Sequence, residues 1–131
     1  MADLAARLAT QITNENSDDA YSAGMLHDCG IPKMMESFND YCTFLSGLEG
    51  DGLSDISSKE KRHYGVDYFT IGAQIAHAWR MPDSICGAIR YQPIYPEGLF
   101  DLSNEVSEAS KTLSCLILLA KDISNHYRKY W

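Results

Sequence analysis

The stretch Ala20–Lys33, which reads A-Y-S-A-G-M-L-H-D-C-G-I-P-K, decides the fold of this chain. Its small and apolar residues recur at steps of three or four positions: Ala20, Ala23, Gly24 and Leu26. This spacing predicts a helix that buries one face, and Gly30 with Pro32 is expected to end it just after His27 and Asp28. An imidazole and a carboxylate should then lie at the end of a buried helix, where both can face a cleft. Together they suit iron, manganese or zinc as well as magnesium.

The His27–Asp28 pair by itself is a weak signal. A histidine bonded to a backbone carbonyl, followed by an aspartate that caps the next turn, would give the same two letters. The longer phrase A-G-M-L-H-D-C-G-I-P-K is more specific. It resembles the A-G-L-L-H-D-I-G-K segment of the HD superfamily of metal-dependent phosphohydrolases. The resemblance is strongest to the HDOD branch of that superfamily, which is found in bacterial signalling proteins.

A second phrase, Glu60–Gln92, resembles the HDOD pattern E…G-x-D-H-x-x-x-G-x-x-L-x-x-x-W-x-L-P…I…A-I…H-H. The residues that match it in order and spacing are Gly65, Asp67, Gly72, Ala73, Trp79, Pro82, Ile85, Ala88 and Ile89. A weaker match is the closing run L-I-L-L-A-K-D-I, which resembles the family's helix with an Ala-Asp pair. The matches imply one HD-like helical domain over residues 1–131. The family's N-terminal helices would lie before Met1.

The metal-ligand positions of the family are largely replaced. Active HD hydrolases resemble one another in an upstream histidine, the His-Asp pair, further histidines and a distal aspartate. Of these, His27 and Asp28 remain, and no histidine precedes them. The substituted positions are Tyr68, Gln92 and Lys121. The resemblance therefore implies a degenerate metal site.

Two ligands do not close a divalent site, because zinc takes three or four protein ligands and magnesium takes six. We therefore expect no metal cofactor and no catalytic residue. The alternative is that His27, Asp28 and Asp122, which lies one residue out of register, hold manganese, iron or magnesium. Without a metal, His27 is expected to hydrogen-bond Tyr68 or Asp122.

The remaining helices follow from apolar spacing and from Gly and Pro boundaries. The predicted helices are Ala2–Thr13, Lys33–Leu45, Ser57–Gly65, Asp67–Trp79, Asp83–Tyr91 and Ser103–Tyr127. A loop is expected at Gly47–Ser57, and Ser57 with Glu60 resembles a capping box. The residues of the Asp67–Trp79 helix expected in the core are Ile71, Ala73 or Gly72, Ile75, Ala78 and Trp79, with Trp79 as a main anchor. No period-2 alternation of convincing length is present, so the fold class is all-α, a compact bundle of six or seven helices.

Length and composition limit the function further. The 131 residues suit one domain, and no apolar run is long enough for a membrane span. The first residues lack the pattern of a signal peptide, which suggests the cytoplasm. A net charge of −7 opposes nucleic-acid binding. The four cysteines form no C-x-x-C pair, which gives structural zinc little support.

Three functions remain open. The first is a non-enzymatic signalling domain of HDOD type, with other signalling proteins or a small phosphorylated ligand as partners. The second is a metal-dependent phosphohydrolase with an altered site. The third is a plain helical scaffold or oligomerisation unit. The sequence does not indicate the oligomeric state.

Overall fold

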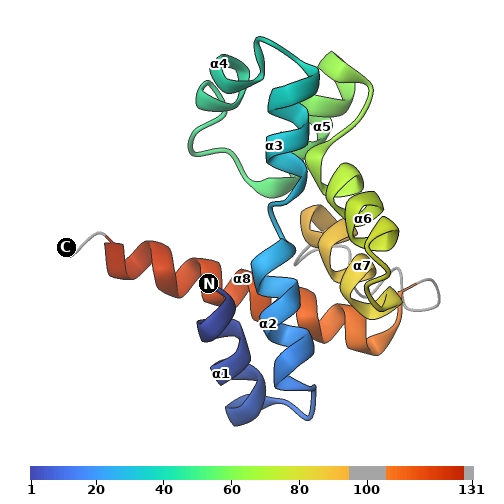
Figure 1. Cartoon of the computed structure of the whole chain (residues 1–131). Coiled ribbons are helices and arrows are strands. Elements are labelled where there is room, and N and C mark those ends of the chain that lie inside the picture. Colours follow the sequence, from blue (N-terminus) through green and yellow to red (C-terminus); the bar gives the residue numbers. More distant parts are fainter. Residues whose placement is uncertain (95–105, 129–131) are drawn as a thin grey trace.

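The computed structural model describes residues 1–94 and 106–128, and these form α-helices and one 3-10 helix without any strand (Figure 1). The elements are α1 (Ala2–Ile12), α2 (Ser17–Leu26), α3 (Gly30–Ser37), α4 (Tyr41–Ser46), α5 (Leu53–Tyr64), α6 (Tyr68–Ala78), α7 (Asp83–Arg90), η1 (Gln92–Ile94) and α8 (Glu108–Arg128). The predicted all-α class is confirmed. Within the described ranges, no helix combines the length and the apolar character that crossing a membrane would require.

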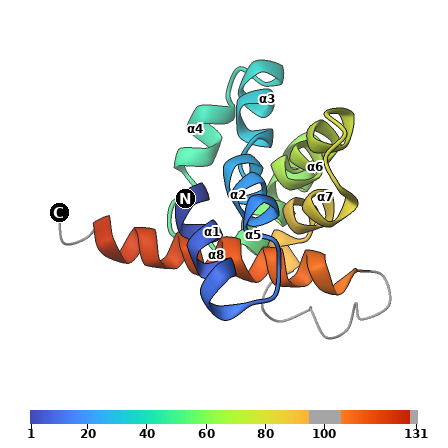
Figure 2. The same ribbon diagram turned by 60° about the horizontal axis from the view of Figure 1, so that its bottom comes forward.

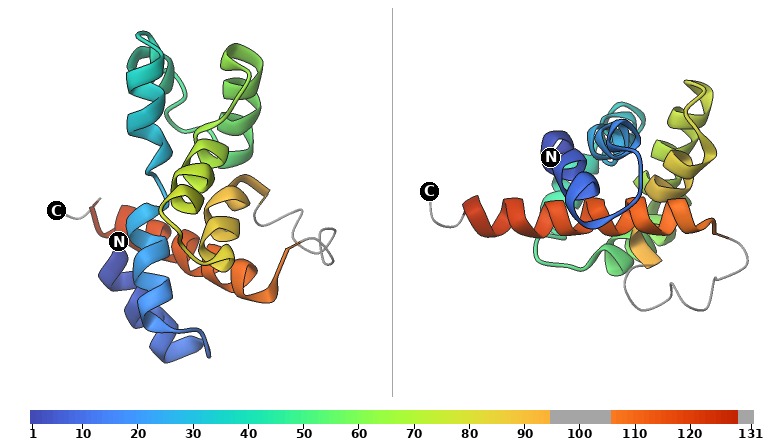
Figure 3. Two further views of the ribbon diagram at one scale, coloured as in Figure 1. Left: turned by 45° about the vertical axis from the view of Figure 1, so that its right-hand side comes forward. Right: turned by 90° about the horizontal axis from the view of Figure 1, so that it is seen from below.

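The longest helix, α8, contacts α1, α2 and α7. It runs along one side of the molecule, with α1 and α2 packed as a hairpin against it and α7 crossing it nearer its start (Figures 2 and 3). Helices α3, α4 and α5 form the end of the molecule that lies away from α8 (Figure 1). Helix α6 packs against both α3 and α7 and so connects the two parts.

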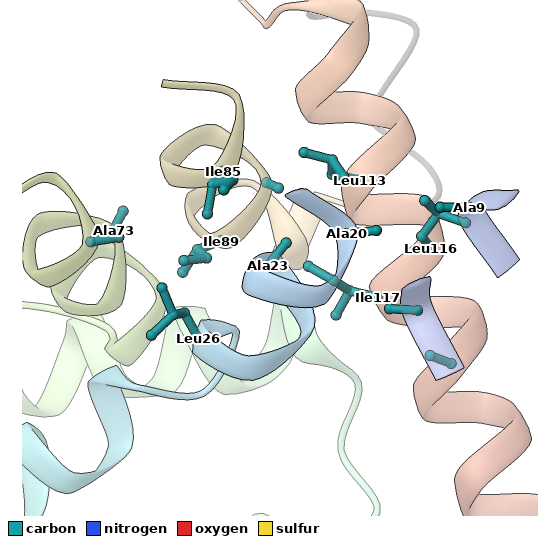
Figure 4. Close-up of a cluster of buried hydrophobic side chains, with 14 residues drawn as sticks. Ala9, Ala20, Ala23, Leu26, Ala73, Ile85, Ile89, Leu113, Leu116 and Ile117 are labelled. Carbon is teal, nitrogen blue, oxygen red and sulfur yellow. The ribbon is translucent and has the colours of Figure 1, made fainter. Parts of the chain in front are cut away.

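Two apolar clusters form the core. The larger one joins α1, α2, α6, α7 and α8 and consists mostly of alanines, with Leu26, Ile85, Ile89, Leu113, Leu116 and Ile117 among them (Figure 4). Small side chains let these helices approach one another closely, as the spacing in Ala20–Lys33 predicted. The smaller cluster has Met34, Tyr41, Tyr68 and Phe69 at its centre and joins α3 to α6. The His-Asp pair lies at the junction of α2 and α3, between the two clusters.

Several element boundaries differ from the predictions. Helix α3 begins at Gly30, which was expected to end a helix, and not at Lys33. The predicted start of the last helix, Ser103, lies outside the described residues, and α8 begins at Glu108. The segment predicted as one helix, Lys33–Leu45, is two helices, because the chain is extended at Phe38 (φ −131°, ψ 113°) and turns before α4. This adds one helix to the seven segments predicted. Helix α5 starts at Leu53 with Gly52 as its N-cap, so the second half of the predicted loop Gly47–Ser57 is helical and Ser57 caps nothing.

The predicted core face of α6 is only partly correct: Gly72 and Ala73 are buried as expected, whereas Ala78 is exposed. The buried residues of this helix are Tyr68, Phe69, Gly72, Ala73 and Ala76, whereas Ile71 and Ile75 are only partly buried. Nearly every position of α6 is apolar or small, so periodicity did not single out one face. Trp79 is 60% exposed. It lies after the last helical residue, and Arg80 follows with a φ of 60°, so the helical spacing used to place Trp79 no longer applies there.

Candidate functional site

His27 ends α2 and is buried between two hydrogen-bond acceptors. Its Nδ1 atom lies 2.6 Å from the carbonyl oxygen of Gly24, and its Nε2 atom lies 3.0 Å from Oδ2 of Asp28. The Gly24 carbonyl oxygen only accepts, so Nδ1–H donates to it, while Nε2 faces the Asp28 carboxylate. The expected partners, Tyr68 and Asp122, are not the residues that these contacts reach.

Asp28 lies in the turn between α2 and α3 and faces two cationic or potentially cationic groups. Its Oδ1 atom is 3.5 Å from Nζ of Lys121, while Oδ2 is taken by His27. Burial alone would raise the pKa of Asp28. The hydrogen bond from His27 and the charge of Lys121 outweigh burial, and the pKa is lowered from its ordinary value. Asp28 is thus held as a carboxylate.

Lys121 reaches this turn from α8, on the opposite side of the core. Its Nζ atom lies 3.3 Å from Oε1 of Gln92 as well as 3.5 Å from Asp28. Burial lowers the pKa of Lys121, and the attraction of Asp28 offsets part of that shift. The ammonium group therefore lies between a carboxylate oxygen and an amide oxygen. These are the kinds of oxygen that a hard divalent cation would take as ligands.

Gln92 connects the turn to η1. Its side chain is fully buried, and Nε2 donates to the carbonyl oxygens of His27 (3.0 Å) and Ile89 (3.1 Å). With Oε1 facing Lys121, every polar atom of the amide has a partner. Gln92 therefore provides a hydrogen-bond donor for the His27 carbonyl at the end of α2. The contacts around the turn join four residues, which we call the ionic cluster: His27, Asp28, Gln92 and Lys121.

Tyr68 and Asp122 do not enter this ionic cluster through any described contact. Tyr68 is the first residue of α6 and is almost fully buried, and burial together with the nearby charge of Asp28 raises its pKa. Asp122 is exposed on α8. No group of three or more His, Cys, Asp or Glu among the described residues could hold a metal ion. The donor set at His27–Asp28 does not fit a divalent metal well, because it has only two His or Asp ligands and the Lys121 ammonium beside them would repel the cation.

The ion pair between Asp28 and Lys121 is expected to couple the two residues weakly. Because the Asp28 side chain is 43% exposed, solvent screens the pair. In a double-mutant cycle of Asp28→Asn and Lys121→Met, we expect a coupling of about 0.5 kcal/mol in the free energy of unfolding. Urea unfolding of the four proteins at low and high salt measures it, and the coupling should shrink at high salt.

The matched control pair is Lys33 with Glu36, which is more exposed and lies 3.0 Å apart on α3. The coupling of Lys33 with Glu36 should be smaller than the coupling of Asp28 with Lys121. An equal coupling in both cycles would mean that Lys121 contributes nothing beyond an ordinary surface ion pair.

A second polar group of residues lies at the start of α6. Asp67 is the N-cap predicted from the sequence, and its Oδ1 accepts from the backbone N–H of Thr70 at 2.8 Å. Its other oxygen accepts a short hydrogen bond from the Ser57 hydroxyl and lies 3.6 Å from Nζ of Lys61. Burial raises the pKa of Asp67, but these partners outweigh it and the pKa is lowered. Ser57 thus reinforces the cap of α6 instead of capping its own helix.

Glu60 is the buried acid that sequence patterns did not reveal. It is fully buried, Oε2 accepts from the Tyr41 hydroxyl at 3.1 Å, and Oε1 has no partner among the described residues. Burial, with the charge of Asp67 added to it, raises the pKa of Glu60 to about 7. From the sequence, Glu60 was placed only in a capping box with Ser57 and at the start of the phrase that resembles the HDOD pattern, and neither predicted its burial.

Comparison with known protein families gives a match over most of the chain. The HDOD domain pattern matches residues 1–95, which is more than half of the chain. The matched range includes His27, Asp28, Tyr68 and Gln92, whereas Lys121 lies beyond it. No curated protein and no solved structure shows significant similarity to this chain.

Proposed function

This chain belongs to the HDOD domain family, and on that basis we propose that it is a non-catalytic regulatory domain of bacterial signal transduction. It would act in the cytoplasm through contacts with other signalling proteins or with a small phosphorylated ligand. No nucleic acid or membrane partner is proposed, because the chain carries a net charge of −7.

The observation that carries this proposal is the position of Lys121. Metal-dependent phosphohydrolases use a divalent cation to polarise the phosphate and to generate a hydroxide from bound water. An ammonium group brings one positive charge without open coordination positions, so it can balance Asp28 but cannot activate water in this way.

The alternative, a phosphohydrolase with an altered site, would need His27, Asp28 and Asp122 to converge on one ion. Asp122 is exposed on α8, and its neighbour Lys121 is the residue that faces the turn. Successive residues of a helix point about 100° apart, so both side chains cannot reach the turn together. The arrangement therefore does not favour this alternative.

Metal analysis and a phosphodiesterase assay test the proposal. After incubation with Mn²⁺, Fe²⁺ or Zn²⁺ and exhaustive dialysis, the protein is expected to retain far less than one equivalent of metal, because a ligand set of two residues binds weakly. With Mn²⁺ added, it should hydrolyse bis(p-nitrophenyl) phosphate no faster than buffer with Mn²⁺. Asp28→Asn serves as the matched variant in both measurements.

Near one equivalent of bound metal, together with a hydrolysis rate that Asp28→Asn abolishes, would overturn the proposal in favour of the hydrolase. Equal background rates for the two proteins support it.

A further inference from the structure

A polar cavity of about 580 Å³ lies between α5, the start of α6 and the segment that follows α7. Hydroxyl and cationic side chains line one part of it: Ser54, Ser57, Ser58, Lys61, Thr70 and Arg90. Tyr91, Pro93 and Ile94 line the other part. The volume lies in the range of small-molecule binding sites and far exceeds that of one phosphate ion.

The cavity exists because one face of α5 carries short side chains. Ser54, Ser57, Ser58 and Lys61 stand at positions i, i+3, i+4 and i+7, which places them on one side of the helix. This side faces η1, against which α5 packs. Leucines at these positions would fill the space between the two elements, whereas serines leave it open and line it with hydrogen-bonding groups.

The cavity has free donors. Arg90 is exposed and makes no hydrogen bond or ion pair with any other described residue, and the same holds for the hydroxyls of Ser54 and Ser58. Arginine binds phosphate oxygens through two parallel N–H groups, and serine hydroxyls donate to the same oxygens. These groups converge on one space, so they can act on one anion.

The charge balance of the cavity also favours an anion. Two cationic side chains, Lys61 and Arg90, face one carboxylate, Asp67. Both oxygens of Asp67 already accept hydrogen bonds, from Thr70 N–H and from Ser57. Asp67 also lies 3.6 Å from Nζ of Lys61, so these two charges offset each other, and Arg90 leaves the cavity lining net positive although the whole chain carries −7.

We propose that this cavity binds a phosphorylated small molecule of nucleotide size, with its phosphate between Arg90 and Lys61 and its organic part against Tyr91 and Pro93. The inference rests on the proposed regulatory function and names the ligand class and the site for it. The site is separate from the ionic cluster. Gln92 points to His27 and Lys121, while the residues on either side of it line the cavity.

Calorimetric titration with defined probes tests this site. The probes are AMP, adenosine, which lacks the phosphate, and inorganic phosphate, which lacks the organic part. All titrations contain EDTA, so that binding through a metal at His27–Asp28 does not contribute. AMP is expected to bind at least about 10-fold more tightly than adenosine or inorganic phosphate. Adenosine lacks the charge-assisted contact with Arg90, and inorganic phosphate lacks the contact with Tyr91 and Pro93.

Variants identify the residues that carry the binding. Arg90→Gln should weaken AMP binding about 10-fold, whereas Lys61→Arg, which keeps the charge, should preserve it. The matched control is Arg62→Gln, because Arg62 is an exposed cation on the same helix that does not line this cavity. Thermal unfolding of each variant shows whether it is folded.

Several outcomes would overturn the inference: no AMP binding at millimolar concentration, equal binding of AMP and adenosine, equal binding of AMP and inorganic phosphate, or an equal loss in Arg90→Gln and Arg62→Gln. These outcomes leave the proposed function standing, because that function depends on metal content and hydrolysis. Stoichiometric metal with hydrolysis would instead remove the proposed function and leave the EDTA-resistant AMP site in place.

Discussion

Gly30→Ala is expected to lower the free energy of unfolding by about 3 kcal/mol or more, because the position has no room for a methyl group. A Cβ atom at Gly30 would lie 1.9 Å from the carbonyl oxygen of Tyr68 and 2.9 Å from the backbone nitrogen of Gly72. These two atoms belong to successive turns of the α6 backbone. Neither can rotate away as a side chain would, so α3 and α6 would have to separate.

Gly52→Ala is the matched control for this prediction. Gly52 also lies at the start of a helix, its φ of −69° suits any residue, and nothing lies within 4 Å of an added Cβ. The change should cost less than about 1 kcal/mol, because only the preference for glycine over alanine at an N-cap is lost. Urea unfolding measures both variants. A loss below about 1 kcal/mol in Gly30→Ala would mean that α3 does not pack on α6 as described.

The wild-type protein is expected to lose stability as the pH rises from about 4.5 to 7, and Glu60 is the cause. In the folded chain the pKa of Glu60 is raised from its ordinary value of 4.5 to about 7. Between these values the folded protein holds a proton that the unfolded chain has released. The stability that Glu60 contributes is therefore fully present below pH 4.5 and lost as the pH passes 7. The loss is on the order of 3 kcal/mol.

Glu60→Gln should flatten this part of the pH dependence, because an amide cannot ionise. It keeps an oxygen that can accept from the Tyr41 hydroxyl. Equilibrium unfolding between pH 4 and 9 provides the measurement, and Glu49→Gln, at an exposed position, serves as the control that keeps the wild-type profile. The pKa values of Asp28, Asp40 and Asp67 are lowered from 3.8, so their effect on the pH dependence of stability lies outside the range from pH 4.5 to 7. A Glu60→Gln profile with the same slope as the wild type would contradict the assignment.

Gly30 and Glu60 both belong to the packing around the ionic cluster. Gly30 follows the His-Asp pair by two residues and lets the backbone of α3 lie directly on α6. Glu60 and Tyr41 form a buried hydrogen bond, and Tyr41 packs in the same apolar cluster as Tyr68 at the start of α6. The turn that carries His27 and Asp28 is thus fixed on one side by close backbone packing and on the other by Lys121 and Gln92.

Much of the fold could be predicted from the sequence, because it depends on local rules. Alanine and glycine spacing placed α2, the Asp67 cap placed the start of α6, and Pro82 placed the start of α7. The phrase around His27 and Asp28 was specific enough to indicate the family. Local rules failed on α6, where most positions are apolar or small and polar residues do not mark one face clearly. They also failed at Trp79, where the helix ends.

By itself, the sequence determined the helical class and the family, because both follow from the order and spacing of its residues, and it predicts that Tyr68, Gln92 and Lys121 replace ligand positions of the family. It could not show what the substitutions do. The contact of Lys121 with Asp28 spans 93 residues and that of Gln92 with His27 spans 65, so packing of α8 and η1 against the turn decided both. The same holds for the cavity between Lys61 and Arg90. Charges and donors from different helices become one site only after the core brings those helices together.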